Sequence, residues 1–193
     1  EREAYEAELC ATVEAEGAAL LKNENNALPL ASGAKVSLFG HGSVDLMYGG
    51  TGSGSVDTSK APNLKDALEA QGITINQTLW DLYKSDSMMS KYSRMTPASI
   101  SDTLEANTQY AVNEAPWSAL SSAESSFAEY GDAAIVVLSR SGGEGADLPS
   151  GANGTNDSWI SGQEGDGNYL ALSAEEIELL QNLKALKDNG TFK

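Results

Sequence analysis

An unbroken apolar run, Ala133–Leu138, constrains the fold of this 193-residue chain more than any other feature. The run is far shorter than the roughly 18 apolar residues of a membrane-spanning helix. It also lacks the alternation of polar and apolar side chains that marks a strand with one face in water. Such a run is typical of a strand that is buried on both faces at the centre of a parallel sheet. We therefore expect a parallel sheet built around this strand.

The remaining patterns predict strands that alternate with helices. Apolar segments at 35–40 and 73–75 predict two further strands, and helical patterning predicts helices over 5–22, 62–70, 76–94, 117–130 and 174–188. Ser173 and Glu176 stand at capping-box spacing before the last helix. This order indicates an α/β fold with a mostly parallel sheet flanked by helices. The polar segment 96–116 predicts a surface insert, and 189–193 is where a fourth strand is expected to begin.

Two long glycine-rich loops, 41–60 and 141–168, follow the first and third predicted strands. Parallel strands present their carboxyl ends at one edge of the sheet, and ligand sites of open α/β sheets form at that edge. We therefore expect the two loops to lie side by side and to form a ligand site.

The charge balance narrows the choice of ligand. The chain has 12 Lys and Arg against 28 Asp and Glu, which gives a formal net charge of −16. Nucleic acids and anionic membrane surfaces are both bound through Lys and Arg, so we expect neither partner. One cysteine and one histidine cannot build a zinc site, and we expect no metal and no other cofactor.

The glycine loop leaves several alternatives open. A phosphate-binding P-loop needs a lysine after its last glycine, where this chain has Ser55. A dinucleotide-binding turn needs a third glycine close to the strand, where this chain has Asp45. In the second loop, an EF-hand-like spacing over 153–164 lacks the glycine that a calcium loop requires. A glycine loop of purely structural use stays open, but we favour a loop whose backbone lines a pocket for a neutral ligand.

Three segments resemble glycoside hydrolase family 3. Gly17–Leu30, which reads GAALLKNENNALPL, resembles the segment that opens the α/β sandwich domain of that family. Tyr48–Gly54 (YGGTGSG) resembles the glycine loop after the first strand of that domain. Ser141–Asp147 (SGGEGAD), followed by Tyr169–Ser173 and Glu176, resembles the acid-bearing loop and the helix after it. The resemblance implies that residues 1–193 are a part of this sandwich domain.

The resemblance also implies an active site that is shared between two domains. In this family a (β/α)8 barrel supplies a nucleophilic Asp, and the sandwich supplies the general acid/base Glu in a Gly-Glu-Gly-x-Asp-type loop. Carried over residue by residue, this implies Glu144 as the acid/base, with Glu164 as the alternative because a glycine also follows it. Trp159 and Tyr169 are expected either to pack on the apolar face of a sugar or to cover the sheet edge. The full set of residues expected at the substrate is Gly50, Thr51, Asp147, Trp159 and Tyr169.

These implications describe a retaining, exo-acting β-glycosidase of the β-glucosidase type, with β-linked glycosides or oligosaccharides as substrates. The chain contains no barrel and no Ser-Asp-Trp-type nucleophile segment, so we expect it to be part of a longer protein and inactive alone. The form of the glycine loop resembles relatives in which the sandwich precedes the barrel, which would place the barrel after Lys193. The alternative is a non-catalytic α/β carbohydrate-binding or interaction module, and a nucleotide-binding domain ranks third. The segment has no signal peptide, and we expect a cytoplasmic protein.

Overall fold

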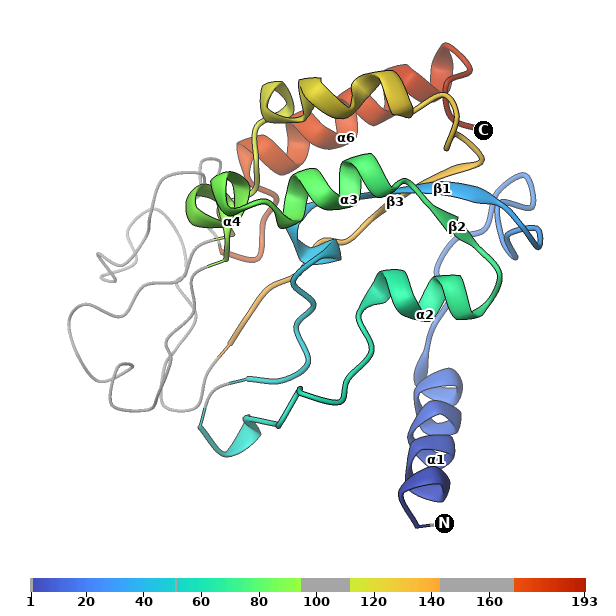
Figure 1. Cartoon of the computed structure of the whole chain (residues 1–193), viewed down its shortest axis with the longest axis vertical. Coiled ribbons are helices and arrows are strands. Elements are labelled where there is room, and N and C mark those ends of the chain that lie inside the picture. Colours follow the sequence, from blue (N-terminus) through green and yellow to red (C-terminus); the bar gives the residue numbers. More distant parts are fainter. Residues whose placement is uncertain (1, 51, 95–111, 143–168) are drawn as a thin grey trace, which may run out of the picture. The chain divides into compact units, whose positions relative to one another are not determined.

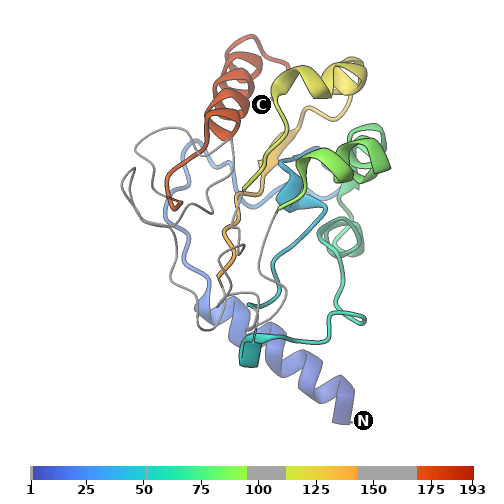
Figure 2. The same ribbon diagram turned by 90° about the vertical axis from the view of Figure 1, so that its left-hand side faces the viewer.

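The computed structural model describes residues 2–50, 52–94, 112–142 and 169–193 of the chain. The chain forms two compact units, Glu1–Ala31 and Ser32–Lys193. The second unit contains the sheet and all described helices except the first one (Figures 1 and 2). Both long glycine-rich loops belong to the second unit.

The first unit consists of one helix and a loop. The helix, α1, covers Arg2–Gly17 and ends earlier than the predicted helix 5–22. Glycine is a poor helix former, and the bond from the Ala18 N–H to the Glu14 carbonyl is the last of the helical type. In the loop, the Asn23 side chain exchanges two hydrogen bonds of 2.9 and 3.0 Å with the backbone of Leu28. Asn23 thus stabilises the turn within Gly17–Leu30, the segment that resembles the opening of the family domain.

The second unit is built on a three-stranded parallel sheet with the order β2-β1-β3. The strands are β1 (Lys35–Phe39), β2 (Thr74–Ile75) and β3 (Ala133–Val136). β1 lies at the centre, and its last four residues are buried. The prediction that Ala133–Leu138 forms a buried central strand is wrong for the described sheet, because β3 pairs with β1 alone and is half-buried. An apolar run indicates that a strand is buried, but it does not indicate whether the strand lies at the centre or the edge of the sheet.

Helices cover both faces of the sheet (Figure 1). One face carries α2 (Leu64–Ala70), and the other carries α3 (Gln77–Lys84) and the 3-10 helix η3 (Trp117–Ser126), against which α6 (Ala174–Asp188) packs. The predicted helix 76–94 is divided, because Ser85 is extended and caps a separate helix, α4 (Asp86–Tyr92). Of the helices in the described ranges, none has the length and apolar character needed to cross a membrane.

A cluster of aromatic rings holds the elements of one face against β1. The Phe39 ring lies 5.2 Å from the ring of Phe127, 5.8 Å from that of Phe192 and 6.3 Å from that of Trp117, measured between centroids. Phe127 follows η3 and Phe192 follows α6, so the cluster joins three distant parts of the sequence. The contacts of Phe39 with Phe127 and Phe192 are edge-to-face and the contact with Trp117 is stacked. Aromatic pairs of both kinds stabilise a core beyond the apolar area that they bury.

Two sequence predictions near the ends of elements are corrected. Residues 189–193 form a turn and coil, and the fourth strand expected to begin there is not formed in the described part of the chain. Of the predicted surface insert 96–116, residues 95–111 lie outside the described residues. Its last part is not on the surface, because Val112, Glu114 and Ala115 are 2, 4 and 2 % exposed.

Candidate functional site

The glycine loop leaves β1 directly beside the end of β3. Gly40 has a φ of +83°, in the left-handed region that glycine adopts without strain. A Cβ atom at Gly40 or at Gly42 would lie 2.8 Å from the carbonyl oxygen of Val137, so this approach is open to glycine only. The prediction that both long loops leave the same edge of the sheet is confirmed by this contact.

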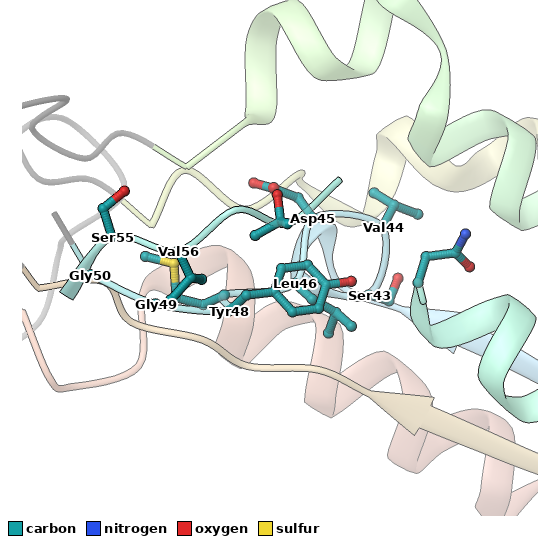
Figure 3. Close-up of a pocket in the computed structure, with 12 residues that line it drawn as sticks. Ser43, Val44, Asp45, Leu46, Tyr48, Gly49, Gly50, Ser55 and Val56 are labelled. Carbon is teal, nitrogen blue, oxygen red and sulfur yellow. The ribbon is translucent and has the colours of Figure 1, made fainter. Parts of the chain in front are cut away.

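The glycine loop surrounds a cavity of about 280 Å³ (Figure 3). The loop contains two short 3-10 turns, η1 (His41–Ser43) at its start and η2 (Gly52–Gly54) in its glycine-rich part. The Tyr48 hydroxyl donates to the Pro62 carbonyl at 2.8 Å. Among the described residues that line the cavity, Asp45 is the one charged residue, and no lysine or arginine is present. A cavity without a cation favours a neutral polar ligand over a phosphate.

Gly50 brings the glycine loop into contact with the second loop. Gly50 is exposed and lines the cavity, and a Cβ atom on it would lie 3.0 Å from the carbonyl oxygen of Gly142. Gly142 comes immediately before the segment 143–168. The predicted ligand-binding position Gly50 thus lies against the beginning of the acid-bearing loop.

Arg94 forms a second bridge between the loops. Its guanidinium group donates to the Asp45 carbonyl at 2.9 Å and to the Ser139 hydroxyl at 3.4 Å, and it forms an ion pair of 2.9 Å with the Asp45 carboxylate. Asp45 belongs to the glycine loop, and Ser139 follows β3. The bridge neutralises the one charged residue of the cavity lining.

Arg140 and Glu176 form a buried ion pair that was not singled out from the sequence. The two guanidinium Nη atoms donate to the two carboxylate oxygens of Glu176 at 2.7 Å each, and the Glu176 side chain is 1 % exposed. Glu176 also accepts the Ser173 N–H at 2.8 Å, which confirms the predicted capping box of α6. The S-x-x-E pattern predicted the cap, but no local pattern links it to an arginine 36 positions earlier.

Tyr169 lies in the interior beside this ion pair. Its ring is 0 % exposed, and its hydroxyl accepts the Ser141 N–H at 3.0 Å. The Arg140 guanidinium carbon lies 5.9 Å from the ring centroid, within the range of a cation–π contact. The predicted stacking of this ring on a sugar does not agree with the structure, because a fully buried ring has no face to offer.

A buried polar cluster lies beneath the start of the glycine loop. The Glu114 carboxylate accepts the His41 N–H at 2.9 Å and the Ala115 N–H at 3.0 Å. His41 Nδ1 lies 3.2 Å from Glu114 Oε2, but neither ring nitrogen has an aligned hydrogen-bond partner among the described residues. The Tyr83 hydroxyl accepts the Gly40 N–H at 3.1 Å. Burial, and then the charge of Glu114, raise the pKa of Tyr83 well above its usual value, so the phenol stays neutral.

The other predicted site residues lie outside the described residues. They are Thr51, Glu144, Asp147, Trp159 and Glu164. What the structure brings together is their surroundings: Gly50, next to Thr51, and Gly142, shortly before Glu144, are in contact at the carboxyl edge of the sheet. This edge offers a neutral polar cavity next to a loop whose two ends are held by buried hydrogen bonds.

Comparisons with known proteins agree with this architecture. The family described as the glycosyl hydrolase family 3 C-terminal domain matches residues 18–191. Beta-glucosidase A of Butyrivibrio fibrisolvens is 34 % identical over 146 residues, which cover 72 % of this chain and 15 % of that protein. The chain therefore spans only a small part of the length of this relative.

Solved structures of beta-glucosidases share the fold. The enzyme from Paenibacillus barengoltzii matches with a TM-score of 0.60 and 25 % identity, over 86 % of this chain and 16 % of that one. Beta-glucosidase 3B from Thermotoga neapolitana, solved in complex with glucose, matches with a TM-score of 0.65 and 24 % identity, over 97 % of this chain and 23 % of that one. The α/β fold with a parallel sheet is confirmed, and since the family match covers nearly the whole sequence, the chain belongs to the glycosyl hydrolase family 3 C-terminal domain family.

Proposed function

We propose that this chain is the acid/base half of a retaining β-glycosidase of the β-glucosidase type. Glu144 is the general acid/base, and the glycine loop around Gly50 and Thr51 contacts the bound sugar together with Asp147 and Trp159. The catalytic nucleophile comes from a (β/α)8 barrel domain outside these 193 residues. The relatives named above are beta-glucosidases, and glucose is the sugar we propose for the site.

One observation carries the proposal: the contact between Gly50 and Gly142. It joins the cavity of the glycine loop to the start of the loop that contains Glu144. The cavity is lined without lysine or arginine among its described residues, as suits an uncharged sugar. Glu144 follows Gly142 by two residues in the sequence, which supports a role for its carboxyl group at a ligand held in the cavity.

The chemistry explains why a glutamate is wanted here. A retaining glycosidase needs one carboxylate to attack the anomeric carbon and a second carboxyl group, about 5–5.5 Å away, to protonate the departing oxygen. The second group then removes a proton from the water that releases the sugar. The protonation step is needed most when the leaving group is a poor one, since a poor leaving group cannot depart without a proton. The second step acts after the leaving group has departed and does not depend on it.

The test is the Glu144→Gln variant of the complete protein, assayed with two glucosides. With an alkyl β-glucoside, whose leaving group needs protonation, kcat/KM is expected to fall about 10²–10⁴-fold, the scale of general acid catalysis. With 2,4-dinitrophenyl β-glucoside, whose leaving group departs unaided, kcat/KM is expected to fall less than about tenfold. Equal losses with both substrates would contradict the role of Glu144.

Glu164→Gln is the matched control, since it removes the same charge from the same loop. It is expected to leave both kcat/KM values within about threefold of wild type, well below the effect of losing an acid catalyst. If Glu164→Gln alone shows the leaving-group dependence, the acid/base is Glu164. If neither variant loses activity, the chain is a non-catalytic carbohydrate-binding or interaction module.

A further inference from the structure

The segment 143–168 is held at both of its ends by one buried network. Arg140 and Ser141 precede the segment, and Tyr169, Ala171 and Glu176 follow it. We name these five residues the clasp. Five of its hydrogen bonds join the part of the chain that enters the loop to the part that leaves it.

Arg140 makes most of the connections in the clasp. Its Nε donates to the Tyr169 carbonyl at 2.7 Å, and Nη2 donates to the Ala171 carbonyl at 2.6 Å. Both Nη atoms also reach the Glu176 carboxylate at 2.7 Å. Only the planar, five-donor guanidinium group can satisfy these acceptors at the same time, whereas a lysine ammonium is a point charge with three donors.

The carboxylate side of the clasp is fixed just as firmly. Glu176 is 1 % exposed and belongs to the first turn of α6, where it also accepts the Ser173 N–H. The helix and the capping box therefore fix the position of the Glu176 carboxylate independently of Arg140. A buried guanidinium group beside such a carboxylate has little freedom to move, because leaving it would strand two buried charges.

Tyr169 adds a second tie next to the first. Its hydroxyl accepts the Ser141 N–H at 3.0 Å and lies 3.2 Å from the Ser141 hydroxyl, while its ring is buried and faces Arg140. Ser141 is the last fixed residue of the clasp before the loop. Three residues further on stands Glu144, and three extended residues span at most about 10 Å.

From this geometry we infer that Arg140, Tyr169 and Glu176 are positioning residues, which set the place of the acid/base glutamate through the backbone of Ser141. The inference rests on the proposed function of Glu144. It gives the buried charged network a role, because the network fixes Ser141 and Tyr169, which flank the segment 143–168 on either side. Catalysis is sensitive to such placement, since an error of about 1 Å can cost on the order of 10²-fold in rate.

The test uses Arg140→Lys and Tyr169→Phe in the complete protein, with the same pair of glucosides. Each variant is expected to lower kcat/KM for the alkyl glucoside by roughly ten- to a hundredfold, the scale of a misplaced catalytic group, with less than about threefold change for the dinitrophenyl glucoside. A purely structural role would lower the amount of folded enzyme and reduce both values equally. Equal losses, or no loss, would overturn the inference.

Tyr83→Phe is the matched control for Tyr169→Phe. Both changes remove a buried phenolic hydroxyl that accepts one backbone N–H, from Gly40 at 3.1 Å and from Ser141 at 3.0 Å. Tyr83→Phe is expected to lower the melting temperature without any leaving-group dependence of kcat/KM. If Arg140→Lys fails to fold, Tyr169→Phe decides alone, because it keeps the ring and the ion pair.

Glu144→Gln separates the two proposals. If Glu144→Gln shows the leaving-group dependence and the clasp variants do not, the positioning role is wrong and the proposed function stands. If Glu144→Gln itself shows no such dependence, the proposed function fails and the positioning role fails with it. The combination of Arg140→Lys with Glu144→Gln is expected to be no worse than Glu144→Gln alone for the alkyl glucoside, because the group being positioned is already lost.

Discussion

Glu114 and Glu176 are both buried, at 4 and 1 % exposed, and each is bonded to the chain close to where one of the two long loops begins. Glu114 is bonded at the start of the glycine loop and is held by backbone N–H groups, those of His41 and of its own neighbour Ala115. Glu176 holds the stem of the acid-bearing loop and is paired with the full charge of Arg140. The two loops thus share one edge of the sheet but are fastened by different means.

The difference follows from what each loop needs. The glycine loop turns tightly against β3, where Gly40 and Gly42 pass close to the Val137 carbonyl, so a short reach from a carboxylate to a backbone N–H is enough. The residues that flank the acid-bearing loop are distant in the sequence, with 36 positions between Arg140 and Glu176, and a long side chain with several donors joins them. Arg140 reaches the backbone of Tyr169 and Ala171 as well as Glu176. Hydrogen bonds from backbone N–H groups to Glu114 hold the tight turn, whereas the two ends of the long loop are joined by the side chain of Arg140.

The largest effect on the free energy of unfolding is expected when each of the two buried glutamates is replaced by alanine. Glu176→Ala leaves the Arg140 guanidinium, only 16 % exposed, without its counter-ion, and breaking a buried pair in this way costs about 3–5 kcal/mol of unfolding free energy. Glu114→Ala leaves backbone N–H groups without acceptors and is expected to cost less, about 1–3 kcal/mol. Urea unfolding of the 193-residue chain, with circular dichroism as the probe, measures both.

The isosteric variants Glu176→Gln and Glu114→Gln serve as controls for the loss of packing. They keep the volume of the side chain, so any gap between them and the alanine variants is due to shape rather than charge. A larger loss for Glu114→Ala than for Glu176→Ala would reverse the comparison. It would mean that the N–H contacts of Glu114 hold the fold more strongly than the buried ion pair.

The contacts of Glu176 include one that the sequence predicts and one that it does not. The capping box of Ser173 and Glu176 is a local pattern and was predicted correctly, as was the meeting of the two loops, which follows from parallel strands alone. The partner of Glu176 was not predictable, because its link to Arg140 crosses the whole second loop. Long-range partners of buried charges leave no periodic trace in a sequence.

The errors in the fold have similar physical causes. The apolar run Ala133–Leu138 predicts a central strand, yet the central strand is β1, which contains the polar Ser37. Ser37 is tolerated there because its hydroxyl donates to the Tyr130 carbonyl at 3.3 Å and accepts from Asn76 at 3.1 Å. Apolar patterning therefore understates the burial of a strand whose polar residue is fully bonded. Likewise, the helix expected over 76–94 breaks at Ser85, whose side chain caps the next helix.

A smaller effect, dependent on pH, is expected at Tyr83, the neighbour of Glu114. The pKa of Tyr83 is raised well above its usual value by burial, and further by the charge of Glu114, against the Gly40 N–H, which lowers it. A raised folded-state pKa stabilises the fold fully below the unfolded value of about 10, and this stabilisation is lost as the pH rises above that value. At pH 7, Tyr83→Phe is expected to cost about 1–3 kcal/mol because it strands the Gly40 N–H.

The free-energy difference between wild type and Tyr83→Phe is expected to shrink as the pH rises from 8 to 11, because only the wild type has this phenol to ionise on unfolding. Urea unfolding at several pH values measures the difference. Tyr48→Phe is the control, since it removes the hydroxyl group of an exposed tyrosine instead of a buried one. A difference that stays constant up to pH 11 would show that Tyr83 titrates normally, and that Glu114 does not act on it.

The smallest effect is expected from Asp132, a carboxylate that contrasts with both buried glutamates. It precedes β3, forms an ion pair with Lys193 and accepts the Lys35 N–H at 2.8 Å. Its hydrogen bond with Lys193, and then that with Lys35, lower its pKa. A lowered folded-state pKa stabilises the fold above the unfolded value of about 3.9, and this stabilisation is lost as the pH falls through the folded value.

Asp132→Asn is therefore expected to lower the melting temperature slightly at pH 7, and the gap to wild type is expected to close in strong acid. Because the group is open to solvent, 1 M salt should also narrow the gap at pH 7, since the screening length there is about 3 Å. The ion pair of Arg140 and Glu176 is shielded from such screening by burial, so the loss caused by Glu176→Ala should persist in 1 M salt. A salt-independent gap for Asp132→Asn would mean that the hydrogen bond to the Lys35 backbone, and not the charge of Lys193, provides the stabilisation. In that case the exposed Asp132 and the buried pair of Arg140 and Glu176 would not differ in how salt affects their contribution to stability.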